Sequence, residues 1–416
     1  MKRKFTRILC LVLCLALLPI FLFSCKAGPI YSLGPYEITE SQYKYLAGMF
    51  NRQVLESVGL FGYSYDAVDE SSGMSIGEAL DKNYSTDFTA SVISLLYSQL
   101  LFDKYELTLD EATIKLIDSN VATIVQYYGG GSSQKFDLVS EKYGYTSADL
   151  KAVYTMQMKQ RAVADYLFGV NGEKIDNEEL SKYYNANYMF FQTIVINNVY
   201  RVVTKEVDGV TKTEMIPLDE NEVKVRNDII SDLNNLFISP VEGYVYKVID
   251  PTKSYEELYA LYSDDTAYPQ GCYSKFPTVL TAQNAITAAY LLRENDVGKI
   301  VAKRPFTQDG TFTIDGEAVT VKAGDYLPYG YAFVKRMPLG EGAYDNEQYS
   351  DFFTTFRTDA KSKLFGIRMQ EYILSEANFE LEESDRISEI PLSSVMANNL
   401  DYNFFYGDLG KGKENS

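Results

Sequence analysis

The sequence predicts an α+β protein, in which an all-helical N-terminal part precedes a mixed part and a returning helix. Apolar residues recur at helical spacing through residues 36–170, without the alternation of strands and helices that a parallel sheet requires. From residue 190 to 335, short β-rich runs are separated by Asp-Gly turns at 208–209, 309–310 and 315–316. The helical period returns over about 345–375.

Capping residues mark where the helices of the first part begin. Thr39 with Gln42, and Thr146 with Asp149, match the pattern of a capping box. The apolar spacing predicts further helices over about 78–105 and from Leu109 to about 128, where a run of glycines ends the helix. The region 61–77 is rich in Gly, Ser and Asp and is expected to be a surface loop.

The mixed part begins after the turn Asn171-Gly172. Asp176 is placed to cap a helix that ends near Asn187. A strand is expected over 190–196, and β-formers on both sides of residues 208–209 predict a hairpin. The remaining elements are predicted helices over 219–236 and 253–262, followed by strands between 297 and 335.

The N-terminus has the composition of a bacterial lipoprotein signal. Four basic residues precede an apolar run from Ile8 to Phe23, and the run ends at Leu22-Phe23-Ser24-Cys25. Cys25 is the expected lipid-attachment site. A plain secretory signal and an uncleaved anchor helix are the alternatives.

Composition restricts the chemistry. The chain has no histidine, so it has no Ser-His-Asp or Cys-His nucleophile system and no histidine-based zinc site or general base. Loss of the four basic residues in the signal changes the net charge from −18 to −22, which argues against a nucleic-acid partner. Cys272 is the one cysteine left after processing and lipidation, so no intramolecular disulfide is expected. No metal or cofactor is predicted.

Several stretches, taken in order, resemble the PrsA-like and SurA-like extracytoplasmic foldases, which carry a parvulin-type prolyl isomerase domain. The opening run GPYEITESQY at 34–43 resembles the start of their helical module, and IDNEELSKYYNANY at 175–188 resembles the helix before their parvulin domain. Within that domain the similar stretches are SYEELYALYSDD at 254–265, GCYSKF at 271–276 and YGYAFVK at 329–335.

The resemblance also implies which residues occupy the parvulin site. Asp265 falls on the family's catalytic Cys/Asp position, with the alternative that it is a turn acid beside Asp264. The two family histidines are replaced by Thr193 and Ala332, and the substrate groove includes the positions of Thr281 and Tyr290. We expect the Thr193 hydroxyl to be able to reach Asp265. Without the histidines, the resemblance implies a degenerate site, and catalysis is left open.

The predicted function is that of a membrane-anchored extracytoplasmic foldase or chaperone that binds unfolded secreted chains, with prolyl isomerase activity lost. The alternatives are an active parvulin-type isomerase and a solute-binding lipoprotein, which would require repeated βα units. The expected domains are a signal peptide 1–24, a tether 25–35, a helical domain 36–172, a degenerate parvulin-like domain 173–340, a C-terminal helix 341–395 packing on the helical domain, and a polar tail 396–416.

Overall fold

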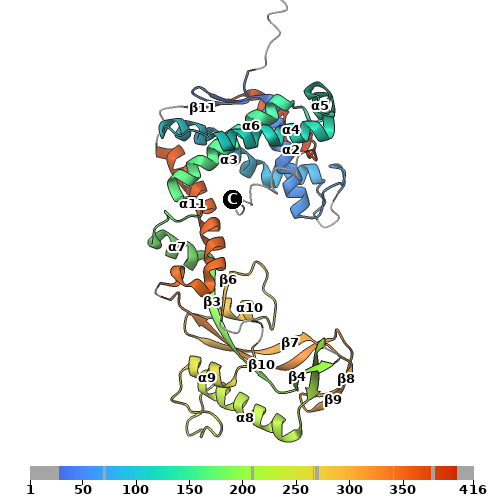
Figure 1. Cartoon of the computed structure of the whole chain (residues 1–416), viewed down its shortest axis with the longest axis vertical. Helices are drawn as coiled ribbons and strands as arrows, with labels where there is room; N and C mark the ends of the chain where they lie inside the picture. The colour runs from blue at the N-terminus through green and yellow to red at the C-terminus, as the bar shows by residue number, and fades with distance from the viewer. Residues whose placement is uncertain are drawn as a thin grey trace, which may run out of the picture. The chain divides into compact units, whose positions relative to one another are not determined.

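The computed structural model describes residues 28–400 apart from 69–71, 208–209, 266, 268–270, 341 and 376–379. Its contacts divide the chain into two compact units, Met1–Lys174 with Thr358–Ser416, and Ile175–Arg357. Both units combine α-helices with antiparallel strands, which confirms the α+β class (Figure 1). The signal peptide, Cys25 and residues 401–416 lie outside the described residues. No helix in the described ranges is both long enough and apolar enough to cross a membrane.

The first unit is built largely from helices that begin at the predicted caps. Thr39 and Thr146 each form a complete capping box, with Gln42 and Asp149 respectively. Ser75 forms another with Glu78. The helices are α2 (Glu40–Ser57), α3 (Ile76–Lys104), α4 (Glu111–Gly129), α5 (Ser133–Ser140), the 3-10 turn η1 (Glu141–Tyr143) and α6 (Ser147–Phe168).

A small sheet joins the two ends of the described chain within the first unit. Its antiparallel order is β11 (Leu381–Glu383), β1 (Tyr31–Leu33) and β2 (Tyr36–Ile38). Ile30, Tyr31 and Leu33 have no exposed surface. Residues 30–33, which the sequence placed in a tether, are therefore part of the core, and strands of three residues are too short to show a period.

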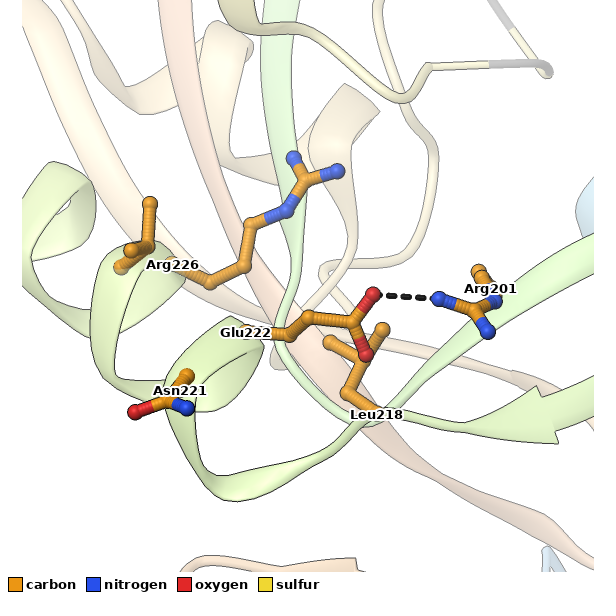
Figure 2. Close-up of a pocket in the computed structure, with 6 residues that line it drawn as sticks. Arg201, Leu218, Asn221, Glu222 and Arg226 are labelled. Carbon is orange, nitrogen blue, oxygen red and sulfur yellow. Dashed lines mark hydrogen bonds and ion pairs between the residues drawn. The ribbon is translucent and has the colours of Figure 1, made fainter.

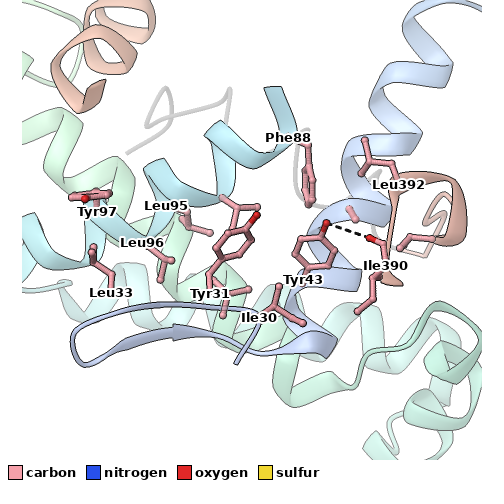
Figure 3. Packing of buried hydrophobic residues seen from close by; sticks show 14 of the residues in the cluster. Ile30, Tyr31, Leu33, Tyr43, Phe88, Leu95, Leu96, Tyr97, Ile390 and Leu392 are labelled. Carbon is pink, nitrogen blue, oxygen red and sulfur yellow. Dashed lines mark hydrogen bonds between the residues drawn. The ribbon is translucent and has the colours of Figure 1, made fainter. Parts of the chain in front are cut away.

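The main core of the first unit lies between α2, α3 and the residues that follow helix α11 (Ser350–Ser375). Tyr43 and Phe88 meet edge to face at 5.2 Å between ring centroids, and Leu392 is buried in the same cluster (Figure 3). Two short 3-10 turns, η4 (Asp385–Glu389) and η5 (Leu392–Ser394), carry the chain across this core. Asn398 and Leu400 are also buried, so residues 396–400 of the predicted tail pack against the fold.

The second unit is organised around a sheet in the order β6 (Cys272–Lys275), β3 (Tyr188–Asn197), β10 (Tyr326–Met337) and β7 (Val297–Pro305), all antiparallel. Side chains alternate between its two faces. Ile194 and Phe333 face α8 (Glu220–Phe237) and α9 (Tyr255–Tyr262), whereas Val195 and Ala332 face α10 (Ala285–Leu291). The helix α7 (Asn177–Asn187) precedes the sheet and is capped by Asp176, as predicted.

Two hairpins extend from one end of the sheet and share a core of their own. They are formed by β4 (Tyr200–Val207) with β5 (Val210–Pro217), and by β8 (Gly310–Ile314) with β9 (Glu317–Val321). Tyr200, Phe306 and Phe312 are the large rings of their shared cluster. The Gln308 side chain joins them by bonding both the amide and the carbonyl of Met215, at 3.0 and 2.7 Å.

The aromatic stripe of the returning helix α11 (Ser350–Ser375) does not pack on the helical domain, contrary to the expectation from the sequence. It follows the 3-10 turns η2 (Ala343–Asp345) and η3 (Glu347–Tyr349). Phe352 and Phe356 pack edge to face on Tyr188 of the second unit, at 5.8 and 5.1 Å between centroids. Further along the helix, Met369 is buried in the core of the first unit. One helix therefore supplies apolar residues to two separate cores.

Candidate functional site

The positions that the resemblance assigns to two histidines lie on neighbouring strands. β3 pairs with β10, with Thr193 opposite Val334 and Val195 opposite Ala332. Residues directly opposite each other share a face of the sheet, so all four side chains point towards α10. Thr193 and Ala332 are both buried, at 1% and 4% exposed. The predicted adjacency of strands 190–196 and 329–335 is confirmed.

Asp265 lies beside Thr193, as the sequence predicts. The Thr193 hydroxyl donates a hydrogen bond to the Asp265 carboxylate. The other Asp265 oxygen accepts the amide of Ala267 at 2.8 Å. Ser263 fixes the segment against β3, since its hydroxyl accepts the amides of Val195 and Asp265, both at 3.1 Å. Asp265 is thus both a hydrogen-bonded partner of Thr193 and a turn acid.

Asp264 points away from this pair and has a structural role. Its amide donates to the Val195 carbonyl at 2.7 Å, and its carboxylate accepts the amide of Asn197 at 3.0 Å. The same carboxylate forms an ion pair with Arg226 of α8 at 2.9 Å. The two adjacent acids therefore fix opposite sides of one short segment.

The other two predicted groove residues lie at either end of α10. The Asn284 side chain caps this helix by accepting the amides of Ile286 and Thr287, at 2.9 and 3.2 Å. The Thr281 amide donates to the Thr287 hydroxyl at 3.1 Å. Tyr290 is 37% exposed, and its ring packs on Phe276 at 5.1 Å. Among the described contacts, none joins Thr281 or Tyr290 to the Thr193–Asp265 pair.

The Cys272 thiol interacts electrostatically with the Asp265 carboxylate. Burial raises the pKa of the Cys272 thiol, and the Asp265 carboxylate raises it further. A raised pKa keeps the sulfur protonated at neutral pH, and the thiol is a weak nucleophile. With no histidine in the chain, the site offers a carboxylate, a hydroxyl and a protonated thiol, which is a poor set for proton transfer at neutral pH.

Sequence reasoning missed the role of Tyr255. This side chain is 4% exposed, and its hydroxyl lies between β3 and β10 on the face opposite Thr193. The hydroxyl donates to the Phe333 carbonyl at 2.6 Å and accepts the amide of Ile194 at 3.2 Å. Burial raises the Tyr255 pKa, so the group stays a neutral structural link.

A pocket of about 380 Å³ lies on the α8 side of the second unit (Figure 2). Its lining includes Arg201 and Arg226, which the sequence analysis did not single out. Arg201 forms an ion pair with Glu222, and Arg226 forms the ion pair with Asp264. Both guanidinium groups are already matched by carboxylates, so the pocket is not an obvious anion site. The described residues also include no group of three or more Asp, Glu or Cys positioned to hold a metal ion.

No protein-family model matches the chain, and a comparison with curated proteins found no match. Solved structures are similar to it, among them the foldase protein PrsA from Streptococcus pneumoniae, at 16% identity and a TM-score of 0.23, covering 77% of this chain and 94% of that one. PrsA from Bacillus subtilis matches at 14% identity and a TM-score of 0.21, covering 78% and 97%. The peptidylprolyl isomerase PrsA from Bacillus cereus matches at 13% and 0.24, covering 82% and 96%.

These structures belong to the PrsA group that the sequence motifs resemble. Identities of 13–16% concern the fold alone. TM-scores near 0.2 do not define a common arrangement over the whole chain.

Proposed function

We propose that this protein is an extracytoplasmic foldase or chaperone, anchored by a lipid on Cys25, which binds unfolded secreted chains and has lost prolyl isomerase activity. The observation that carries the proposal is the Thr193–Asp265 pair beside Ala332. An alanine methyl can neither donate nor accept a hydrogen bond, and Thr193 already uses its proton on Asp265. The site therefore keeps apolar walls but lacks the hydrogen-bonding histidines of the family that the sequence resembles.

The chemistry of isomerisation supports the loss of activity. Rotation about a prolyl peptide bond has a barrier of ~20 kcal/mol and takes tens of seconds without a catalyst. An enzyme must stabilise the twisted bond by placing polar groups where charge changes in the transition state. At the positions of Thr193, Ala332 and Asp265, one is an alanine and the other two are paired with each other.

Exposed apolar side chains support client binding. Val279 and Leu280 precede α10 and Leu291 is its last residue, and they are 74%, 55% and 67% exposed. In the first unit, Tyr127 and Leu138 are 71% and 72% exposed. Binding of unfolded chains needs accessible apolar surface of this kind, and a net charge of −22 after processing would keep loaded complexes soluble.

The anchoring part of the proposal rests on the sequence, because residues 1–27 lie outside the described part. The lipobox-like run ending at Cys25 would attach the chain to the outer side of the cell membrane. The linker between Cys25 and the fold would be short, because Ile30, five positions further along the sequence, is already fully buried. The first unit would therefore sit close to the membrane surface.

Two alternatives remain as outcomes of experiment. An active isomerase is favoured by one observation, that Thr193 and Asp265 keep a polar pair at the predicted place. A solute-binding lipoprotein would need βα repeats. In the described parts of residues 40–168, the chain forms helices joined by turns, with one isolated bridge between Val68 and Ser75.

An aggregation assay tests the proposal. The purified full chain, at equimolar amounts, should slow the aggregation of an unfolded secreted protein. Leu280→Ser and Leu291→Ser should weaken this protection. Val202→Ser, at a similarly exposed position on the β4–β5 hairpin, serves as the matched control. Failure of the full chain to protect any unfolded client would contradict the proposal.

A further inference from the structure

Strand β7 is an outer strand of the four-stranded sheet, with β10 on one side only. Outer strands present unpaired amides and carbonyls that an extended chain can use to add a further strand. Proteins often protect such edges with proline, bulges or a covering segment. The free edge of β7 is therefore open to strand addition unless another part of the chain covers it.

The side chain of Gln283 covers one backbone amide of this edge. Its side-chain oxygen accepts the amide of Val301 at 2.5 Å. The Val301 amide therefore points away from β10, and because the backbone direction alternates, Lys299 and Lys303 present their amides on the same outer edge. Among the described residues, no backbone group pairs with this edge. Gln283 thus occupies the place where a carbonyl of an incoming strand would lie.

Gln283 is held in an uncommon backbone conformation, with a φ of +57°. Few residues other than glycine adopt positive φ, and such positions are often linked to function. Here the conformation directs the side chain at the Val301 amide. A single side chain covers one amide, and it can rotate away when a better acceptor arrives.

The side chains along this edge are basic. Lys299, Val301 and Lys303 share one face of β7, because alternate residues of a strand point the same way. Lys299 lies over the ring of Tyr331 at 4.2 Å, and Lys303 is exposed. Neither lysine forms an ion pair with a residue in the described ranges. Unpaired positive charge is notable in a chain of net charge −18.

We propose that the free edge of β7 binds an extended segment of an unfolded chain by strand addition, and that it favours segments with acidic residues facing Lys299 and Lys303. Directly opposite residues share a face, so the acids must be four residues apart with an apolar residue between them to face Val301. This inference deepens, and rests on, the proposed client-binding function. The backbone amides of β7 and the charges of Lys299 and Lys303 would together recognise the bound segment.

Two labelled peptides of identical composition test the pattern. One carries the acids four residues apart around a central valine, and the other has them three residues apart, so that they point to opposite faces of an added strand. Fluorescence anisotropy with the full chain should show tighter binding of the first peptide, by up to about fivefold for each matched charge pair. Hydrogen exchange of residues 297–303 should slow when this peptide is bound. Equal binding of the two peptides, or unchanged exchange, would overturn the inference.

Variants of the edge sharpen the test. Gln283→Asn tolerates positive φ but is too short to reach Val301, so peptide affinity should rise by about three- to tenfold. Lys303→Glu should abolish the preference, because one acid would still face Lys299 while the other would face the introduced glutamate, so that the acidic peptide binds no better than one with lysines in place of the acids. Lys275→Glu makes the same charge change on the other outer strand, β6, and should leave the preference intact. Because Lys303 is exposed, its variant tests the inference even if Gln283→Asn folds poorly.

The aggregation assay separates the two proposals. If the full chain protects an unfolded client while the β7 variants leave peptide preference unchanged, strand addition fails and client binding stands. If the full chain protects no client, the proposed function itself fails.

Discussion

The hydroxyl of Thr193 donates a hydrogen bond to the carboxylate of Asp265, which lies 72 residues further along the chain. Thr193 is 1% exposed, so this bond satisfies a hydroxyl that water does not reach. It also ties the segment after α9 to strand β3. In the place where the resemblance puts a catalytic side chain, Asp265 therefore makes a structural contact.

Thr193→Val tests this structural role. Valine keeps the shape of threonine but leaves the Asp265 carboxylate without one partner, so the free energy of unfolding should fall by about 1–3 kcal/mol. Denaturant unfolding measures the change. Thr313→Val replaces an exposed threonine in a strand of the same unit and should cost much less. Equal stability of the two variants would show that the bond does not support the fold.

Asn51→Ala should loosen the C-terminal segment of the first unit. Asn51 is fully buried, and its amide donates to the carbonyls of Leu392 and Val395, both at 2.8 Å. Its removal leaves two buried carbonyls without that donor, at a cost of about 2 kcal/mol or more. We expect lower unfolding stability and faster proteolysis within residues 392–400. Gln53→Ala, at an exposed position of the same helix, should change neither.

Buried tyrosines predict a loss of stability at high pH. Burial is the largest cause that raises the pKa values of Tyr273 and Tyr329, each to about 12. The folded state holds their protons more tightly than the unfolded state, where the pKa is about 10. Their contribution is therefore complete below pH 10 and is lost as the pH rises from about 10 to 12. Unfolding measured across this range should show less dependence on pH in a Tyr273→Phe, Tyr329→Phe double variant.

Cys25→Ala tests the anchor. The thiol of Cys25 is the nucleophile that a lipid-transferring enzyme would use, so its loss should release the protein from the membrane fraction or stall its processing. Fractionation and the mass of the mature chain measure this. Cys272→Ala removes the cysteine that lies in the second unit and should leave both the membrane partition and the mass added by the lipid unchanged. Unaltered membrane partition and mass in Cys25→Ala would refute lipid attachment.

Local signals predicted much of the fold. The caps at Thr39, Thr146 and Asp176 act between neighbouring residues, so the sequence alone reveals them. The proximity of Thr193 and Asp265 was also predicted, although from the resemblance rather than from spacing.

The long-range strand pairings could not be predicted from the sequence. β1 pairs with β11 about 350 residues away, and each strand has three residues, so neither shows a period. The division of α11 between two cores was missed because the apolar stripe of a helix does not say which surface it faces. Tyr255 was missed because a buried hydroxyl between two strands has no sequence signature.

The most direct test of the account is a prolyl-peptide isomerisation assay of the full chain, run beside the aggregation assay on the same preparation. We predict isomerisation at close to the uncatalysed rate together with clear protection of an unfolded client. Asp265→Ala should leave the isomerisation rate at background. A robust isomerase rate in the unmodified chain that disappears in Asp265→Ala would contradict the account and establish the protein as an active isomerase.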